Sequence, residues 1–365
     1  MDEKGFWIGL NMVPGLGKVL FYRLLDFFGS AENVFKAREK DLCRVEGIGP
    51  GIAGGILRFN LVKEVEKELA YVQNNNARVF ISRDEDYPEN LKNIFDPPPV
   101  LYMQGTWLKS DMAAVAVVGT RSPSLYGRHV AEKISMELAG RGVTVVSGMA
   151  RGVDSVAHKG ALDGGGRTVA VFGCGLNVIY PAENVKLRNR ILQQGALVSE
   201  YPMARKPDRG NFPARNRIIS GLSLGTIVVE AGERSGALIT TQFALEQGRE
   251  VFAVPGNIDS LKSKGPNLLI KKGAKLVGSV EDVIEEIPPY VREAFLKEGK
   301  SREKGEVKWT EDEAKVLGAL ESGISHIDAL IEHSRLPAGK VSALLLTLEL
   351  NGVVKQLPGK MFVVG

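Results

Sequence analysis

Between residues 113 and 287 the chain alternates short apolar segments with longer amphipathic ones. The segments AAVAVVG, VTVVSG, TVAVFG, ALVSEY, TIVVEA and VFAVPG are short and rich in β-branched residues, and AKLVGS is a weaker seventh. Apolar runs of this length are typical of strands buried on both faces of a sheet. Helical segments such as YGRHVAEKISMELAGRG separate them. The pattern therefore predicts an α/β fold with a doubly wound, mostly parallel sheet.

A small helical domain is predicted before this region. Residues 1–70 contain two similar turns, VPGLGKVLFYRLL at 13–25 and VEGIGPGIAGGIL at 45–57, of the kind that joins the helices of a helix-hairpin-helix (SAM-like) domain. Backbone N–H groups at such turns can hold a phosphate oxygen; the alternative is a turn that only packs against its twin. Residues 71–287 would then form the sheet domain, with RDEDYPENLKNIFDPPPVLYMQG at 83–105 as an extended arm along it, because consecutive prolines exclude helix.

The C-terminal part predicts a linker and a third domain. Residues 288–308 mix prolines with charges of both signs, which is typical of a linker. Residues 309–365 predict three helices and the hairpin VVKQLPGKMFVV, a winged-helix domain. Its third helix offers only Lys340 as a base-reaching cation, and the wing adds Lys355 and Lys360. Protein contact or modest backbone binding is favoured over sequence-specific DNA recognition.

The composition excludes few classes of function. Of the 365 residues 44% are hydrophobic and 25% are charged, and the net charge of +4 allows a nucleic-acid partner without requiring one. The two cysteines, Cys43 and Cys174, lack metal-ligand spacing, so no metal site is predicted and both are expected to be buried and reduced. The segment MDEKGFWIGL has no long apolar run. No membrane span is expected, and a cytoplasmic location is the expectation.

Glycines, hydroxyl residues and arginines follow the predicted strands at their carboxyl ends. In an open parallel sheet these ends form one edge, here called the rim, where ligands bind. Three rim loops open onto helices, where free N–H groups and the helix dipole favour anions, although none has a Walker or a G-x-G-x-x-G pattern. The predicted phosphate-binding residues are Gly119, Thr120, Arg121 and Ser122 after the first strand, Ser147, Gly148, Arg151 and Gly152 after the second, and Ser235 and Gly236 after the fifth.

The most basic part of the rim is the loop after the fourth strand. Residues 203–217, MARKPDRGNFPARNR, hold five basic residues and one acid, which favours a polyanion over a small metabolite. An exposed Phe212 ring could stack on a base, and a ring buried as a hydrophobic staple is an equal alternative. The predicted ligand-binding residues of this loop are Lys206, Phe212, Arg215, Asn216 and Arg217.

Arg215 and Arg217 cannot both face one ligand from the body of a helix. Two residues apart, their directions diverge by about 200°. We therefore expect one to reach a phosphate, with Arg215 favoured because it lies nearer the helix start. The other should pair inward with a carboxylate such as Glu200 or Glu230.

Catalytic chemistry has little support in the sequence. Asp154, Glu200 and Glu230 could serve as acids or bases, but helix capping and arginine pairing explain them equally well, and His158 is expected to be structural. The alternative is a nucleotide phosphoribohydrolase of the LOG kind, which carries a Pro-Gly-Gly-x-Gly-Thr loop before its catalytic glutamate. Here GLSLGTIVVEAGERSG lacks Pro-Gly-Gly and places Glu230 at a strand end. A mononucleotide pocket stays open, and no enzyme is predicted.

The segments GTRSPSLYG, SGMARGVDSVAHKGAL, VFGCGLNVIYP, FPARNRIISGLS and VVEAGERSGALIT, in this order, resemble the bacterial DNA-processing protein DprA (Smf) family. The resemblance implies an extended Rossmann-like fold that forms a homodimer, binds single-stranded DNA at the rim and loads the RecA recombinase on incoming strands during natural transformation. It implies no cofactor and no enzymatic activity. By motif match, DNA contacts would fall on Arg121, Arg151, Phe212, Arg215 and Arg217, beside the glycine loops.

Overall fold

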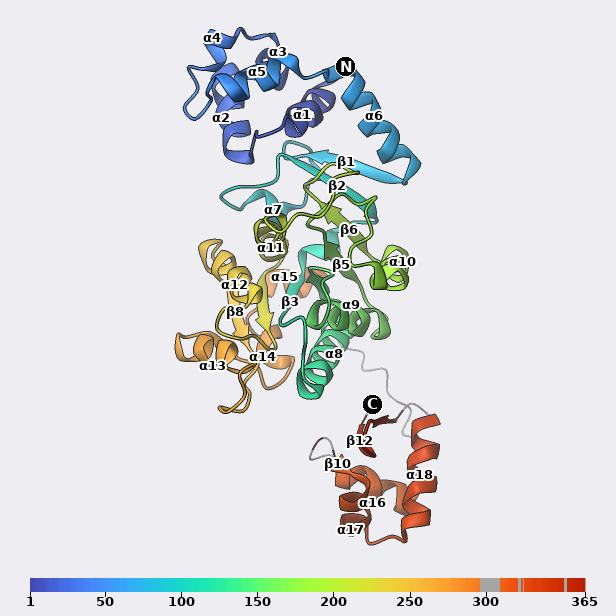
Figure 1. The fold of residues 1–365 in the computed structure, drawn as a ribbon. Helices are drawn as coiled ribbons and strands as arrows, with labels where there is room; N and C mark the ends of the chain where they lie inside the picture. Colours follow the sequence, from blue (N-terminus) through green and yellow to red (C-terminus); the bar gives the residue numbers. More distant parts are fainter. Residues whose placement is uncertain (296–308, 321–322, 324, 351–352, 365) are drawn as a thin grey trace. The chain divides into compact units, whose positions relative to one another are not determined.

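The structure is a computed structural model that describes residues 1–295, 309–320, 323, 325–350 and 353–364 (Figure 1). The described residues up to 295 form one compact unit, and those from 309 onward form a second. Most of the predicted linker, residues 296–308, lies outside the described residues. No helix in the described part of the chain is both long and apolar enough to cross a membrane.

A nine-stranded sheet forms the centre of the first unit, in the order β1-β2-β6-β5-β4-β3-β7-β8-β9. The strands from β3 to β9 pair in parallel, which confirms the predicted fold class and all seven predicted strands. The strands are β1 (Ala77–Ile81), β2 (Val100–Gly105), β3 (Ala114–Val118), β4 (Thr144–Ser147), β5 (Thr168–Val171), β6 (Ala196–Ser199), β7 (Gly225–Val228), β8 (Glu250–Ala253) and β9 (Lys275–Leu276).

The predicted arm is part of this sheet. β2 pairs antiparallel with β6, β1 pairs antiparallel with β2, and the short helix α7 (Glu89–Lys92) lies between them in the chain. The three prolines at 97–99 end directly before β2, so their missing N–H groups remove no ladder bond from it. The end of the predicted arm therefore forms strand β2 of the sheet rather than packing along its outside, and β1 precedes the arm.

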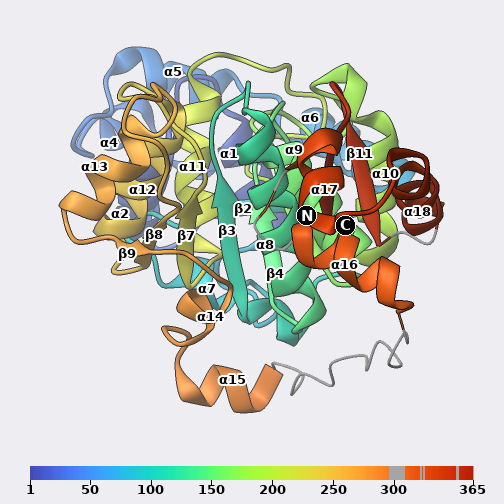
Figure 2. The ribbon, with the colours of Figure 1, turned by 90° about the horizontal axis from the view of Figure 1, so that it is seen from below.

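Helices cover both faces of the sheet, as Figure 2 shows for α11 and α12 on one side of β3 and α8 and α9 on the other. Alternation along β3 explains this: Val115 and Val117 pack with α8 and α9, whereas Ala114, Ala116 and Val118 pack with α11 and α12. The helices of this region are α8 (Leu125–Gly140), α9 (Val153–Asp163), α10 (Val185–Gln194), α11 (Asn211–Gly221), α12 (Gly236–Glu246), α13 (Lys264–Lys271), α14 (Glu281–Ile284) and α15 (Pro289–Phe295), with 3₁₀ turns η1 (Lys109–Met112) and η2 (Ala182–Asn184).

Helix α15 corrects the start of the predicted linker. Val291 is buried in the same apolar cluster as α8 and α9. Pro289 begins the helix, a position where its missing N–H costs no hydrogen bond. The sheet unit thus extends beyond residue 287.

Residues 1–74 form a helical layer rather than a separate domain. Its helices are α1 (Glu3–Met12), α2 (Lys18–Phe28), α3 (Ala31–Lys36), α4 (Glu39–Leu42), α5 (Pro50–Arg58) and α6 (Leu61–Asn74). Both predicted glycine turns join helices, and Gly15 and Gly47 have the positive φ values (81° and 87°) that such turns require. The layer shares one hydrophobic cluster with Tyr102 of β2 and Leu197 of β6, at the edge of the sheet shown in Figure 1. It is therefore continuous with the core of the sheet unit.

The second unit confirms the predicted winged helix. Its elements are α16 (Glu311–Leu320), β10 (Ser325–His326), α17 (Ile327–Ser334), α18 (Ala338–Leu350), β11 (Val354–Leu357) and β12 (Met361–Val364), with strand order β10-β12-β11. Val316, Leu330 and Leu345 lie in its core. Lys340 on the third helix pairs with Asp312 at 2.5 Å, so its charge is already matched.

The cysteine predictions are confirmed only in part. Cys174 is buried, but Cys43 is exposed. Cys43 is the residue that directly follows the four-residue helix α4.

Candidate functional site

Two adjoining hollows lie on the rim of the sheet. The larger encloses about 950 Å³ and is lined by residues that follow β3 and β7 and by helices α11 and α12. The smaller encloses about 480 Å³ and is lined by residues that follow β4 and β5 together with η2. Arg121, Ala150, Tyr180, Phe212 and Arg215 line both.

The loop after β3 forms one wall of both hollows. The backbone N–H of Thr120 donates to the carbonyl of Glu230 at 2.7 Å, and the N–H of Ser122 donates to Thr120 Oγ1 at 3.2 Å. A Cβ on Gly119 would lie 2.6 Å from the side chain of Val153, so only glycine allows this approach to α9. Arg121 is exposed and has no ion-pair partner among the described residues. Its charge is therefore available to a ligand.

The loop after β4 packs closely against the loop after β3. Gly152 has φ 78°, and a Cβ there would lie 2.4 Å from the carbonyl oxygen of Thr120. Gly148 and Arg151 line the smaller hollow, where both Arg151 Nε and Nη2 donate to the Glu183 carboxylate, the latter at 2.9 Å. Ser147 does not reach either hollow, because it is fully buried and its hydroxyl donates to the carbonyl of Val117 at 2.7 Å.

The start of α12 forms the far wall of the larger hollow. Ser235 caps the helix, with its hydroxyl accepting from the N–H of Ala237 at 3.3 Å. Gly236 leaves open space beside it and accepts from Asn216 Nδ2 at 3.2 Å. The exposed Arg234 precedes them in the same wall. Ser235 and Gly236 thus place a helix N-terminus in the wall of the larger hollow, where the helix dipole favours anions.

An aromatic pair separates the two hollows. The ring centroids of Phe212 and Tyr180 lie 5.4 Å apart at 34°. Phe212 is half-buried and Tyr180 is 45% exposed. A Cβ on Gly173 would lie 2.8 Å from the Phe212 ring, so glycine lets the ring lie against the backbone. Phe212 is therefore neither a fully exposed platform nor a buried staple. Sequence reasoning missed Tyr180, whose only signal was an aromatic residue at the end of VFGCGLNVIYP.

Arg215 lies beneath the junction of the two hollows. Its Nη1 donates to the carbonyls of Gly148 (2.6 Å) and Val171, while Nε has no hydrogen-bond partner among the described residues. Burial lowers the pKa of Arg215, and the nearby Asp154 opposes that shift. Burial also raises the pKa of Asp154, which Arg215 opposes in turn. Arg215 is only 4% exposed but lines both hollows, so it contributes positive charge to each of them.

His158 of α9 is fully buried and does not line either hollow. Its Nδ1 lies 2.7 Å from the Thr168 hydroxyl, which itself donates to the Val145 carbonyl, so Nδ1 carries the proton. Burial, with a smaller contribution from Arg215, lowers the pKa of His158 to about 3. A neutral, fully buried imidazole is consistent with the structural role predicted for it.

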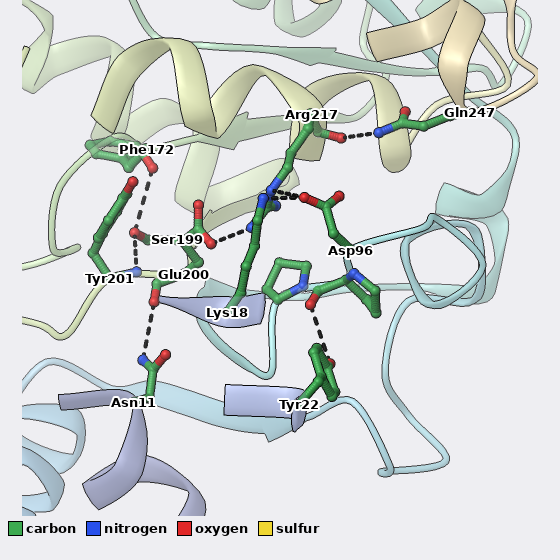
Figure 3. A network of polar contacts seen from close by, with 12 residues as sticks. Asn11, Lys18, Tyr22, Asp96, Phe172, Ser199, Glu200, Tyr201, Arg217 and Gln247 are labelled. Atoms are coloured by element: carbon green, nitrogen blue, oxygen red, sulfur yellow. Dashed lines mark hydrogen bonds and ion pairs between the residues drawn. The ribbon is translucent and has the colours of Figure 1, made fainter. Parts of the chain in front are cut away.

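Arg217 lies outside both hollows and is 1% exposed. Its Nη2 pairs with Glu200 at 2.5 Å and its Nε with Asp96 at 3.3 Å (Figure 3). The predicted inward pairing with Glu200 is confirmed, but the structure does not place Arg217 among ligand-facing residues, because its guanidinium is buried and paired with both carboxylates. Glu230 instead accepts from the N–H and hydroxyl of Ser124 at the start of α8.

Three exposed arginines of the larger hollow have no acid partner among the described residues. Arg121, Arg209 and Arg234 line it and form no ion pair with another described residue. Arg209 is one of the five basic residues of the loop 203–217, and Arg234 lies in the segment EAGERSG. The sequence prediction did not include either of them among the ligand-binding residues. Lys206 is exposed in the same basic loop but does not line either hollow. A concave surface with unpaired arginines, a helix start and two aromatic rings can hold phosphates beside flat rings.

Protein-family models match two parts of the chain. Residues 78–288 match "DNA recombination-mediator protein A", and residues 301–360 match "DprA winged helix domain". Protein Smf of Synechocystis sp. is 36% identical over 392 residues, which cover 99% of this chain and 98% of that protein. The DNA processing protein DprA of Bacillus subtilis is 46% identical over 205 residues, which cover 56% of this chain and 69% of that protein.

Two solved structures are similar as well. The X-ray structure of DprA from Streptococcus pneumoniae has a TM-score of 0.68 at 37% identity, covering 78% of this chain and 99% of that one. DNA processing protein A from Helicobacter pylori has a TM-score of 0.51 at 31% identity, covering 57% of this chain and 94% of that one. The latter structure is described as giving insight into that protein's single-stranded DNA binding mode.

Proposed function

The chain belongs to the DNA recombination-mediator protein A family of DNA-processing proteins, and from this premise we propose that it binds single-stranded DNA along the rim of its sheet. The observation that carries the proposal is the larger hollow, where Arg121, Arg209 and Arg234 have no acid partner in the described part of the chain and lie beside the Phe212–Tyr180 pair. A cluster of unpaired cations around aromatic rings is the arrangement that single strands use, with phosphates on the cations and bases on the rings.

The aromatic pair supports a preference for single strands over duplex. A base can contact the Phe212 or Tyr180 ring only if its own face is unstacked, and in duplex DNA both faces of each base are covered by neighbours. The start of helix α12 at Ser235 and Gly236, together with the loops after β3 and β4, would position the sugar-phosphate backbone of the DNA. The buried Arg215 adds positive charge beneath the DNA-binding surface, and Arg217 fixes helix α11 through its ion pair with Glu200.

Binding of this kind suits a mediator that hands DNA to another protein. We infer that the chain protects incoming single strands and loads the RecA recombinase on them during natural transformation, as a homodimer. The candidate dimer face runs from LITTQFALEQ to NLLIKKGAKLVG, where Leu245 and Leu268 are exposed. Family membership supports this role, and it requires no catalysis and no cofactor.

A nucleotide-hydrolysing enzyme is the weaker alternative. The smaller hollow, at about 480 Å³, has room for a nucleotide. The carboxylate that such an enzyme would use, Glu230, is 2% exposed and accepts two hydrogen bonds from Ser124. A buried carboxylate engaged in this way is poorly placed to act as a base or nucleophile.

Fluorescence anisotropy over a salt series tests the proposal, with labelled oligo-dT and the matching duplex. Phe212→Ala should weaken oligo-dT binding by about 1–3 kcal/mol with the salt slope unchanged, because it removes stacking and no charge. Arg209→Ala should make the slope shallower by about 0.7, the value for one phosphate on a single strand. Equal affinity for duplex, or no effect of either substitution, would contradict the rim as the binding site.

A further inference from the structure

The chain that carries the basic loop is held by the N-terminal helical layer at its beginning. This connection leaves β6 at Glu200, whose carbonyl accepts from Asn11 Nδ2 of α1 at 3.4 Å (Figure 3). Three residues later, the backbone N–H of Met203 donates to the Glu68 carboxylate of α6 at 2.6 Å. Two helices of the layer therefore fix the backbone where the loop starts.

Glu68 is built into this position rather than resting on the surface. It is 3% exposed, and burial raises the pKa of its carboxyl, which the Met203 N–H and the Tyr102 hydroxyl oppose. The Met203 side chain is fully buried in the cluster that the layer shares with the sheet. On the other side, a Cβ on Gly175 would lie 2.1 Å from the Met203 carbonyl oxygen. The stem of the loop is thus clamped between α6 and the loop after β5.

The exposed cations of the loop follow this clamped stem directly. Arg205 donates its N–H to the carbonyl of Pro202 and accepts at its own carbonyl from Gly175, both at 2.9 Å. Lys206 and Arg209 are exposed, and Arg209 lines the larger hollow. The backbone that leads to these cations is therefore fixed at Met203 and Arg205.

The helical layer also holds the helix in which the loop ends. Arg217 on α11 pairs with Asp96, and Asp96 pairs with Lys18 at the start of α2. The Tyr22 hydroxyl donates to the carbonyl of Pro97 at 3.2 Å and fixes the same segment. Figure 3 shows Lys18, Asp96 and Glu200 converging on Arg217.

A shift of Arg217 would be transmitted to the hollow along α11. Phe212 lies five residues before Arg217, about 7.5 Å along a rigid helix axis. Phe212, Arg215 and Asn216 of the same helix line the larger hollow. The position of its wall therefore depends on contacts made on the other side of the helix.

We propose that the N-terminal helical layer is a positioning element of the DNA-binding rim, with Glu68 as the positioning residue for the basic loop and Lys18, through Asp96 and Arg217, for helix α11. The inference rests on the proposed function, since it assigns these residues to single-stranded DNA binding. None of them contacts the hollows, so each acts through the backbone or through another side chain.

The test compares Glu68→Ala, Glu68→Gln and Glu66→Ala in the full chain. Glu66 is exposed on the same helix and controls for loss of the same charge. Glu68→Ala should weaken oligo-dT binding about tenfold and make the salt slope shallower by about 1.4, as if two phosphate contacts were lost. Glu68→Gln keeps an oxygen that can accept from Met203 and should restore both quantities, and Glu66→Ala should change neither. Hydrogen exchange should show faster exchange of the peptide around Met203 in Glu68→Ala only.

A purely structural role predicts a different pattern. In that case Glu68→Ala would lose stability and protection at Met203, while the folded protein bound oligo-dT with unchanged affinity and slope; that result would overturn the inference. If the wild-type chain itself shows no preference for the single strand, the proposed function fails instead. The two failures are therefore distinguishable.

Lys18→Met keeps the inference testable if Glu68→Ala does not fold. It removes the Lys18–Asp96 ion pair but leaves the Asp96–Arg217 pair intact. The exposed Lys63 on α6 provides the control, Lys63→Met. Lys18→Met should weaken oligo-dT binding about threefold while Lys63→Met leaves it unchanged, because a single phosphate contact on the rim would be misplaced. Equal binding by both variants would rule out the link through α11.

Discussion

The larger hollow and the network around Arg217 lie on opposite sides of helix α11, and arginine is prominent in both. In the network, the charge of Arg217 is matched by Glu200 and Asp96 and is removed from solvent. In the hollow, Arg121 and Arg234 have no acid partner among the described residues.

The difference shows that the ion-pair partners of an arginine, rather than its residue type, determine its role. A paired, buried arginine stabilises the helix that carries it, because its removal takes compensating charge away from buried carboxylates. An unpaired arginine in a concave surface contributes little to the fold and keeps its charge for an external anion. Substitutions on the two sides should therefore separate stability from DNA affinity.

The largest effect is expected from Arg217→Met. Removing the guanidinium leaves Glu200 without its cation and Asp96 with Lys18 alone in a mostly buried site, which should lower the free energy of unfolding by about 3 kcal/mol. Urea denaturation measures this as a lower midpoint. The matched variant Arg234→Met should stay within about 0.5 kcal/mol of wild type, since this side chain is exposed. Similar losses in both variants would mean that the two sides of α11 do not differ in this way.

The next effect is a pH dependence of stability caused by His158. Its pKa is about 3 in the folded chain against an ordinary value of 6.5, so the unfolded chain binds this proton first as pH falls. The stability is fully present above pH 6.5 and is lost between 6.5 and about 3. By about pH 5 the loss should reach about 2 kcal/mol.

His158→Asn should remove this part of the pH dependence, measured as the difference from wild type in urea midpoints at each pH. A difference is needed because Asp154, whose pKa is raised by burial, contributes with the opposite sign. The exposed His333 offers a control, and His333→Asn should follow the wild-type curve. If the urea midpoint of His158→Asn falls with pH below 6.5 as steeply as that of the wild type, the buried histidine is not the source of this pH dependence.

A smaller effect is expected at the rim, in the salt dependence of DNA binding. Arg121→Ala should reduce the slope of log affinity against log salt by about 0.7 for oligo-dT, because one phosphate contact is lost. Anisotropy titrations at several salt concentrations give the slope. The control variant Lys133→Ala removes an exposed charge from the body of α8 and should leave the salt slope unchanged. The same change in both variants would indicate a diffuse charge effect in place of a rim contact.

The smallest effect should be a gain. Glu183 holds Arg151 at the edge of the smaller hollow, where it competes with any phosphate for that guanidinium. Glu183→Gln should therefore strengthen oligo-dT binding about two- to threefold, a modest change because exposed ion pairs are weak. Glu66→Gln, on the surface of α6, is the control. Weaker binding by Glu183→Gln would show that Glu183 positions Arg151 for DNA and does not compete with it.

Much of this site could be predicted because it depends on local rules. The carboxyl ends of parallel strands meet at one edge, which brought Thr120, Gly148 and Gly236 to the same rim. The helical period separated Arg215 from Arg217, and the pairing of Arg217 with Glu200 followed from it. These arguments need only the order of the elements and the geometry of one helix.

The errors arise where distant parts of the chain meet. Tyr180 lies against Phe212 only because the connection after β6 returns across the end of β5, and no spacing in the sequence records that contact. The strand β2 was read as an arm because its partner, β6, lies almost a hundred residues later. Ser147 has the residue type of a phosphate ligand, but its side chain points to the Val117 carbonyl within the sheet.

The order of the strands also determines at which stage of protein synthesis the rim site can form. β3 pairs with β7 through Val115–Val118 and Gly225–Val228, segments more than a hundred residues apart. Contacts of such sequence separation form late, because a long loop must close first. The basic loop leaves the ribosome before β7 and before α12, which supplies the wall at Ser235 and Gly236. A nascent chain that has not yet completed this pairing therefore presents cations without the surface that arranges them, and it gains its nucleic-acid site only when the sheet closes.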